Sequence, residues 1–226
     1  PAGRRGQAVP PVAGAAGSSA LFSSPFDETA VDFLKRMNVP CFKVASYEVN
    51  DVILLKKIAR TGKPVIMSIG YADLEDIDLA LETLRENGAK DIAILHCVTG
   101  YTETPDLSAM HLKTIQDITD RFGVVAGFSD NNGGIEIPII AAAYGAAIIE
   151  KHFILRRSDG GPDAKFSIEP GEFKEMVATI RRNEKMLGEP HYGPATEQER
   201  YNMRFRRSLF VVKNIRKGEK FTKENV

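Results

Sequence analysis

The stretch Ala146-Ala147-Ile148-Ile149-Glu150-Lys151-His152-Phe153 decides the fold. Four apolar residues, typical of a buried β-strand, end abruptly in a carboxylate, an ammonium group and an imidazole, and a loop with Gly160-Gly161-Pro162-Asp163 follows. Charged groups at the end of a buried strand are costly unless they face a pocket, a partner or a metal ion. Ligands of parallel α/β folds bind at this end of the strands. The stretch therefore predicts a parallel sheet and a ligand site together.

The same unit recurs between residues 21 and 188: a short apolar run, a polar or glycine-rich stop, and a stretch with helical periodicity. Six runs are predicted strands, at residues 21–23, 41–45, 64–67, 92–95, 124–128 and 147–149. Alternating helices and nearly all-apolar strands predict the α/β class, with a parallel sheet covered by helices. Six units are most of a TIM-type (β/α) barrel, which has eight, so the first two strands are expected to be lacking. A doubly wound open sheet is the alternative, although no Gly-x-Gly-x-x-Gly follows any run, which disfavours a dinucleotide fold.

The pattern divides the chain into four segments. Residues 1–20 are rich in Pro, Gly and Ala without periodicity, and are predicted to be a disordered or unrelated tail. Residues 21–188 form the partial barrel, and residues 189–206 are polar and predicted to be a linker. Residues 207–226 begin a second module with a predicted strand at residues 208–212.

Composition indicates an ordinary globular protein and excludes several classes. The 226 residues are 43% hydrophobic and 27% charged, enough for one sizeable core. A formal net charge of zero gives no electrostatic case for nucleic acid or an anionic membrane surface. No apolar run approaches the roughly 20 residues of a membrane span. Cys41 and Cys97 lie in apolar runs and are predicted to be reduced core thiols of a cytoplasmic protein.

Polar residues follow each predicted strand, and in a parallel barrel all of these ends face one side. Hydroxyls and lysines among them suit an anionic phosphate or carboxylate ligand. Each also has a structural interpretation: a Ser caps a helix, His96 is a satisfied core histidine, Glu48 is a surface charge, and Asp163 belongs to a turn. Only convergence on one face favours the ligand site. The set is Ser23, Ser24, Lys43, Ser46, Glu48, Ser68, His96, Thr99, Tyr101, Ser129, Asp130, Asn131, Glu150, Lys151 and His152.

Several collinear motifs from Leu21 to Val226 resemble the sialic acid synthase family, which condenses phosphoenolpyruvate with an N-acetylated amino sugar to a nine-carbon acid. The motifs are Phe22-Ser23-Ser24-Pro25-Phe26, Phe42-Lys43-Val44-Ala45-Ser46-Tyr47-Glu48, Gly62-Lys63-Pro64-Val65-Ile66-Met67-Ser68, Leu95-His96-Cys97, Gly127-Phe128-Ser129-Asp130, Glu150-Lys151-His152-Phe153 and Gly161-Pro162-Asp163. Arg206-Arg207-Ser208-Leu209 and Lys217-Gly218-Glu219 resemble the start of the family's antifreeze-like (SAF) domain. The resemblance slightly favours the pseudaminic acid branch over the N-acetylneuraminate branch.

The resemblance implies a role for each residue. Glu48 is the implied general acid/base, Lys43 and His152 complete the catalytic set, and His152 holds a divalent metal ion, Mn²⁺ or Mg²⁺, that polarises the sugar aldehyde. Tyr101 and Asp163 are implied contacts of the sugar. The family also forms homodimers. The implied cradle for the phosphate and carboxylate of phosphoenolpyruvate is Ser24, Lys43, Ser46, Ser68 and Ser129, with Thr99 beside them.

The sequence departs from the family pattern at one metal ligand and at both ends. Asn131 stands where the family has a second metal-binding His, and an amide is a poorer ligand for a transition metal than imidazole. Residues 1–20 carry no counterpart of the first two strands, and the second module stops at Val226, so we expect this chain alone to be weakly active or inactive. The alternatives are another phosphoenolpyruvate-dependent barrel of the Kdo-8-phosphate type, and a non-catalytic remnant that binds ligand or oligomerises.

Overall fold

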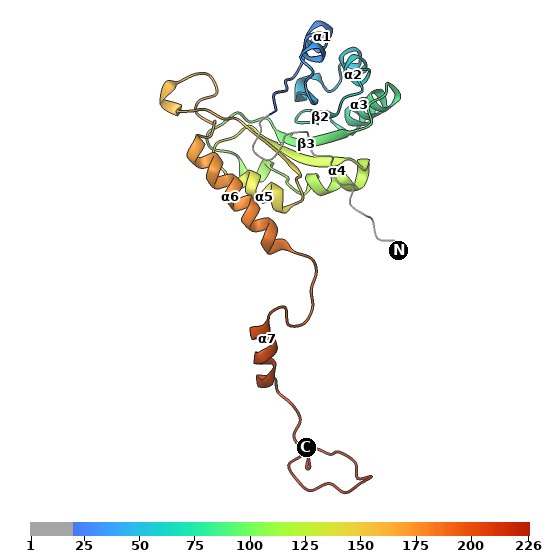
Figure 1. Ribbon diagram of the computed structural model, residues 1–226, viewed down its shortest axis with the longest axis vertical. Helices are drawn as coiled ribbons and strands as arrows, with labels where there is room; N and C mark the ends of the chain where they lie inside the picture. The colour runs from blue at the N-terminus through green and yellow to red at the C-terminus, as the bar shows by residue number, and fades with distance from the viewer. Residues whose placement is uncertain (1–19) are drawn as a thin grey trace. The chain divides into compact units, whose positions relative to one another are not determined.

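A computed structural model describes residues 20–226, and the tail predicted before them lies outside the described residues. The chain divides into two compact units, one that ends at Leu187 and one that covers Gly188–Val226. The first unit contains the whole sheet and six of the helices (Figure 1). No helix among the described residues is both long and apolar enough to cross a membrane.

The first unit is built on one five-stranded parallel sheet in which chain order and spatial order coincide, β1-β2-β3-β4-β5. A doubly wound sheet reverses its strand order at a switch point, so this order excludes that alternative and fits a half-barrel. The prediction of a parallel α/β barrel-type fold is confirmed at this level. The strands are β1 (Phe42–Val44), β2 (Val65–Ser68), β3 (Ile92–Val98), β4 (Val125–Asp130) and β5 (Ile148–Lys151).

The sheet is strongly curved. Lys43 on β1 and Glu150 on β5 belong to the two outermost strands, yet Nζ and Oε2 of these residues are 3.5 Å apart. Strands of a flat sheet are spaced by about 4.8 Å, which would separate the outermost two of five by about 19 Å. Two side chains together cannot span that distance. The concave face therefore closes on itself as in a barrel.

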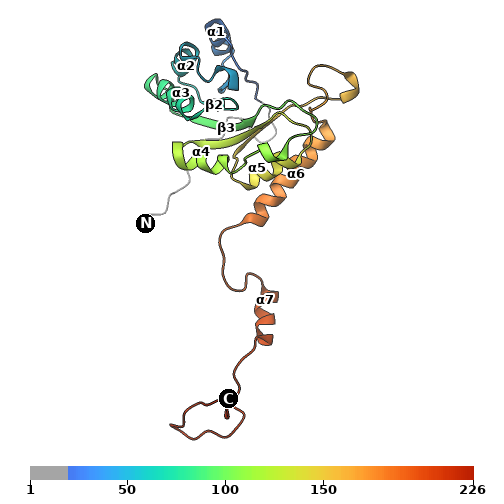
Figure 2. The same ribbon diagram turned by 180° about the vertical axis from the view of Figure 1, so that it is seen from behind.

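The helices follow one another around the sheet in chain order, as both views show (Figures 1 and 2). Asp51 accepts a hydrogen bond from the amide of Leu54 and caps α2. Asp73 and Asp76 form a capping box at the start of α3. The helices of this unit are α1 (Glu28–Arg36), α2 (Val52–Ala59), α3 (Leu74–Glu86), α4 (Thr114–Phe122), α5 (Glu136–Ala143) and α6 (Pro170–Leu187).

Alternate strand residues separate the core from the concave face. Phe42, Met67, Ile94 and Phe128 are fully buried in the apolar cluster between sheet and helices. Because successive side chains of a strand point to opposite faces, the residues between them face the concave side. On β4 this face includes Gly127, where a Cβ would come within 2.6 Å of the carbonyl oxygen of Ile148.

Two predicted strands are wrong. Residues 21–23 form no strand, and only one backbone bond ties them to the sheet, from the Lys43 amide to the Ser23 carbonyl at 3.3 Å. Residues 208–212 form no strand either; the Val212 amide donates to the Asn225 carbonyl at 2.9 Å, and the side chains are exposed. Both runs have strand-like composition, but a strand requires a hydrogen-bonded ladder with a neighbour.

The second unit contains little regular structure. The predicted linker at residues 189–206 includes the helix α7 (Glu197–Asn202), which Thr196 and Glu199 start with a capping box. Arg204 lies over the ring of Tyr201 at 3.7 Å from its centroid, a cation–π contact that extends the same local structure.

We expect Gly127→Ala to destabilise the first unit, because its Cβ would collide with the Leu95 side chain and the backbone of Ile148. Overpacking of this kind costs about 1–3 kcal/mol of unfolding free energy, measured by urea denaturation. The matched control is Gly171→Ala in α6, where nothing lies within 4 Å of the added Cβ. An unchanged urea midpoint for Gly127→Ala would contradict the close packing of β3, β4 and β5.

Candidate active site at the carboxyl ends of the strands

Buried polar side chains concentrate at the carboxyl ends of the strands. Most of the buried polar or charged residues among those described lie on the concave face, at the last residue of β4 or just after it. Because buried polar groups cost free energy unless they are paired or functional, this concentration marks the site. We call it the mouth. Its buried residues are Lys43, Ser68, Ser129, Asp130, Asn131 and Asn132.

Lys43 provides the cationic centre of the mouth. Its Nζ donates to Ser68 Oγ at 2.7 Å and to the Val44 carbonyl at 3.0 Å, and lies 3.5 Å from Glu150 Oε2. Burial lowers the pKa of Lys43, while the charge of Glu150 raises it. The ammonium group is thus held by neighbours from β1, β2 and β5, with its charge directed across the concave face.

Three side chains form a row across the neighbouring strands. Cys97 is the register partner of Ser129, and Ser129 is the register partner of Glu150. Side chains in register share a face of the sheet, so the row brings a thiol, a hydroxyl and a carboxylate to the mouth. Burial raises the pKa of the Cys97 thiol, and hydrogen bonds from the hydroxyls of Ser46 and Ser129 oppose that shift.

Glu48 brings a carboxyl group with an unused oxygen. Its Oε2 is buried and has no hydrogen-bond partner. Burial raises the pKa of Glu48, and the positive charge of Lys43 lowers it. A carboxyl group with a free oxygen and a raised pKa is a better base than an ordinary surface carboxylate, which suits general acid/base chemistry.

Asn131 and His152 lie side by side just after β4 and β5. The Oδ1 of Asn131 is 3.2 Å from Nε2 of His152, and Nδ1 of His152 is 3.5 Å from Oδ2 of Asp163. The rings of Tyr101 and Phe166 contact the imidazole edge-on, with centroids 6.0 and 5.0 Å away. An amide oxygen, an imidazole nitrogen and a carboxylate behind the imidazole fit a divalent cation. No cluster of three or more His, Cys, Asp or Glu side chains suited to a metal ion occurs within residues 20–226.

A buried ion pair precedes this pair of residues. Asp130 and Lys151 are register partners, and Oδ2 of Asp130 lies 2.7 Å from Nζ of Lys151, with both side chains almost fully buried. Asn132 closes the arrangement, because its backbone amide donates to Asp130 Oδ1 and its carbonyl accepts from Lys151. The ion pair fixes β4 against β5 one residue before Asn131 and His152.

The remaining predicted residues lie around or away from this centre. Ser46 accepts from the amide of Gly70 at 3.0 Å, at the rim between β1 and β2. Thr99 is half-buried and its Cγ2 faces Gly70, whereas Ser24 is half-buried on the segment before α1. His96 lies on the opposite face of β3, where Nε2 bonds the Met110 carbonyl and the ring packs on Phe128, so its structural interpretation agrees with this geometry.

Cys97 lies in an apolar run and was therefore predicted to be a core thiol, although its side chain faces the mouth. The alternation of side chains along β3 is the signal that could have identified Cys97. Since His96 and Cys97 are consecutive in β3, they point to opposite faces, and only one of them can reach the mouth.

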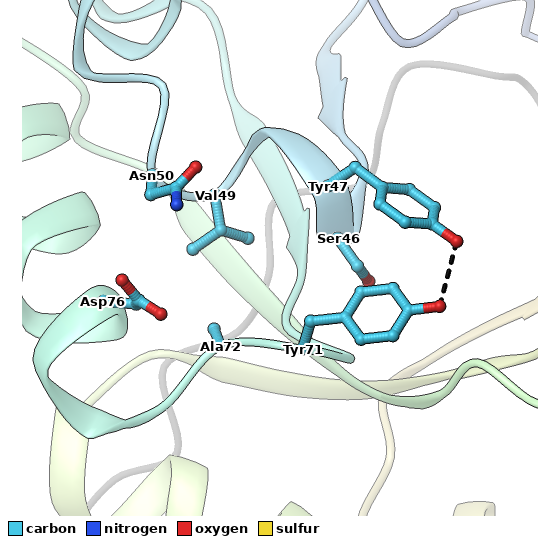
Figure 3. Close-up of a pocket in the computed structure, with 7 residues that line it drawn as sticks. All are labelled: Ser46, Tyr47, Val49, Asn50, Tyr71, Ala72 and Asp76. Carbon is cyan, nitrogen blue, oxygen red and sulfur yellow. Dashed lines mark hydrogen bonds between the residues drawn. The ribbon is translucent and has the colours of Figure 1, made fainter.

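A pocket of about 180 Å³ opens beside the mouth between the loops after β1 and β2 (Figure 3). Tyr47 and Tyr71 face each other across it, with hydroxyl oxygens 2.9 Å apart and ring centroids 4.8 Å apart. The hydrogen bond to Tyr71 raises the pKa of Tyr47 to about 12. Both rings are more than half exposed, so the pair joins the two loops at the surface.

Comparison with known proteins defines the class to which this half-barrel belongs. Residues 16–192 match the NeuB family. The chain is 40% identical to the N,N'-diacetyllegionaminic acid synthase of Campylobacter jejuni, covering 92% of this chain and 62% of the relative. It is also 40% identical to the pseudaminic acid synthase of Helicobacter pylori, covering 91% and 60%. The structure of an N-acetylneuraminic acid synthetase from Leptospira borgpetersenii, in complex with citrate, superposes with a TM-score of 0.73 at 34% identity, covering 82% of this chain and 64% of that one.

The fold and its polar mouth thus place the chain among barrel-type α/β proteins whose relatives are sugar-acid synthases. The chain belongs to the NeuB family, and the predicted membership of the sialic acid synthase family is confirmed. The chain spans about three-fifths of the length of the two synthases it matches.

We expect Tyr71→Phe to lower the pKa of Tyr47 from about 12 towards the ordinary value of about 10, because the partner hydroxyl is removed. The ionisation of Tyr47 is followed by NMR of its own ring carbon, because burial also raises the pKa of Tyr101 and bulk absorbance would mix the two phenols. Tyr192→Phe, which removes an almost fully exposed ring, is the control and should leave the titration of Tyr47 unchanged. A Tyr47 pKa that stays near 12 in Tyr71→Phe would contradict the pairing.

Proposed function

We propose that the chain is the catalytic part of a nonulosonate synthase, which condenses phosphoenolpyruvate with an N-acetylated amino sugar to a nine-carbon 2-keto acid and releases phosphate. The observation that carries the proposal is the grouping of Lys43, Glu48 and the Asn131–His152 pair in one mouth. Family membership and relatives named pseudaminic, legionaminic and N-acetylneuraminate-9-phosphate synthases support it.

Phosphoenolpyruvate binds at Lys43 in this proposal. The ammonium group faces the phosphate and carboxylate, and the hydroxyls of Ser46, Ser68 and Ser129 supply hydrogen bonds around it. Because Lys43 is buried, its charge is only weakly screened by solvent and acts strongly on an anion. Ser24 and Thr99 are the remaining proposed contacts of phosphoenolpyruvate.

Condensation needs an electrophile, a base and an acid. The C3 carbon of phosphoenolpyruvate attacks the aldehyde carbon of the sugar, and the electron pair of the C=O bond moves to its oxygen, which takes a proton. Positive charge develops at C2, water adds there, and the C2–O bond to phosphate breaks. Glu48 stabilises the cationic carbon and accepts the proton of the water, since it lies beside Lys43 with one free oxygen.

Asn131 and His152 hold a divalent ion, Mg²⁺ or Mn²⁺, which polarises the aldehyde when it is bound. Asp163 supports the His152 ring, and Tyr101 borders the sugar next to it. The amide ligand favours an oxygen-preferring ion. The acceptor is an amino sugar of the pseudaminic acid branch in our proposal, although the legionaminic acid relative is equally similar.

The second candidate function is a remnant that binds phosphoenolpyruvate without turnover. Asn131 in place of a histidine favours it. Phosphate release from phosphoenolpyruvate with pseudaminic-type or neuraminate-type amino sugars and Mg²⁺ or Mn²⁺ separates the two. Turnover supports the synthase, and saturable binding without turnover supports the remnant.

Lys43→Met should weaken binding of phosphoenolpyruvate, measured by calorimetry, by at least about tenfold, because a buried charge contact is worth more than 1.4 kcal/mol. Lys90→Met removes the same charge from an exposed lysine that precedes β3, at the amino ends of the strands. This variant should bind phosphoenolpyruvate normally. Absence of binding by the unaltered chain, or equal binding by Lys43→Met, would refute Lys43 as the binding site of phosphoenolpyruvate.

Asn131→His should raise the affinity for Mn²⁺, because imidazole is a stronger ligand than an amide for this ion. Mn²⁺ binding is measured by electron paramagnetic resonance of the free ion. Asn214→His places an added imidazole on an exposed residue of the second unit and should leave the affinity unchanged. Equal effects of the two variants would remove Asn131 from the ion site.

A further inference from the structure

The side chain of Asn131 is held from both ends. Its Nδ2 donates to Cys97 Sγ at 3.1 Å, and its Oδ1 lies 3.2 Å from Nε2 of His152. Asn131 is almost fully buried, so its NH₂ group needs an acceptor inside the protein. Within the described residues, Cys97 provides that acceptor from the neighbouring strand.

The contact with Cys97 decides which end of the amide faces His152. The two ends of an asparagine amide are nearly equal in size, so hydrogen bonds alone determine its orientation. Imidazole Nε2 accepts or donates according to its tautomer and therefore does not select one end by itself. Sulfur that accepts from the NH₂ group turns the oxygen towards His152.

Asp163 orients His152, the other residue of the pair. A carboxylate only accepts hydrogen bonds, and Oδ2 of Asp163 faces Nδ1 of His152, which favours hydrogen on Nδ1 and a bare lone pair on Nε2. The Oδ1 of Asn131 accepts a hydrogen bond from Nε2 when that nitrogen carries the hydrogen. With the hydrogen on Nδ1 instead, Oδ1 and Nε2 both keep a lone pair and lie close enough together to bind one cation.

Because Gly70 has no side chain, the Cys97 thiol has room beside Asn131. A Cβ on Gly70 would come within 3.2 Å of Cys97 Sγ and 2.7 Å of Thr99 Cγ2, so a larger residue after β2 would displace the sulfur. The hydroxyls of Ser46 and Ser129 also act on this sulfur, since they oppose the rise in the pKa of the Cys97 thiol.

We propose that Cys97 is a positioning residue of the cation site: its sulfur fixes the amide of Asn131 so that Oδ1, and not the NH₂ group, is presented to the ion beside His152. The inference rests on the proposed function for the identity of the ion as Mg²⁺ or Mn²⁺. The amide orientation itself is independent of that function and can be tested in the metal-free chain.

The experiment compares Cys97→Ala, which removes the acceptor, with Cys97→Ser, which restores one. Cys41→Ala is the matched control, because Cys41 is the other free buried cysteine of the chain and lies before β1, away from the mouth. Mn²⁺ affinity is measured by electron paramagnetic resonance. In the metal-free chain, nitrogen-15 NMR reports the hydrogen exchange of the Asn131 side-chain amide and the tautomer of His152.

Cys97→Ala should weaken Mn²⁺ binding by about tenfold, the effect of one lost hydrogen bond to a buried group. It should also remove the exchange protection of the Asn131 NH₂ group. Cys97→Ser should restore both, and Cys41→Ala should match the unaltered chain. These results would support the positioning role, since general core damage would affect both alanine variants.

Equal losses in the two alanine variants, or unchanged Asn131 protection in Cys97→Ala, would overturn the inference. If the unaltered chain binds no Mn²⁺, the proposed metal is refuted, and the NMR comparison alone decides the role of Cys97. Lost protection in Cys97→Ala with recovery in Cys97→Ser then supports it, and no change overturns it.

Discussion

The curvature of the sheet is the constraint on which the rest of the structure depends. Lys43 and Glu150 come from strands that are outermost in the sheet, and their contact exists only because the concave face closes. The same curvature directs the hydroxyls of Ser68 and Ser129 towards one centre. In a flat sheet these groups would be separate surface residues without common chemistry.

A second constraint fixes the register at the end of the sheet. Burying one charge is expensive, but Asp130 and Lys151 bury two that neutralise each other and satisfy the Asn132 backbone. Loss of either partner would leave an uncompensated buried charge, so β4 and β5 cannot slip against each other without a large cost. Asn131 and His152 follow directly in the chain, so the fixed register also aligns these two residues with each other.

The sequence was sufficient for elements whose signal is local. Apolar runs bounded by polar stops located all five strands to within a few residues. It was misleading where a strand depends on a partner. Residues 21–23 and 208–212 have strand composition, yet they lack the ladder that composition cannot report.

The mouth was predictable as a location but not in its internal contacts. Parallel strands place their carboxyl ends together, so any polar residue after an apolar run was a candidate. Neither the contact of Lys43 with Glu150 nor that of Asn131 with Cys97 follows from sequence distance. These contacts depend on sheet curvature and side-chain orientation, which no periodicity encodes.

The balance of charges in the mouth connects the proposed binding of phosphoenolpyruvate to the proposed cation site. Lys43 is already opposed by Glu150, and Lys151 is neutralised by Asp130, so the lysines of the mouth leave no net positive charge for a trianion. Glu48 adds a carboxyl group beside Lys43, so it supplies no positive charge either. In the proposed function, an ion at Asn131 and His152 would supply the positive charge that these residues lack. A chain that binds phosphoenolpyruvate in this mouth therefore needs that ion for affinity as well as for polarising the aldehyde, because an unneutralised anion in a buried site is costly.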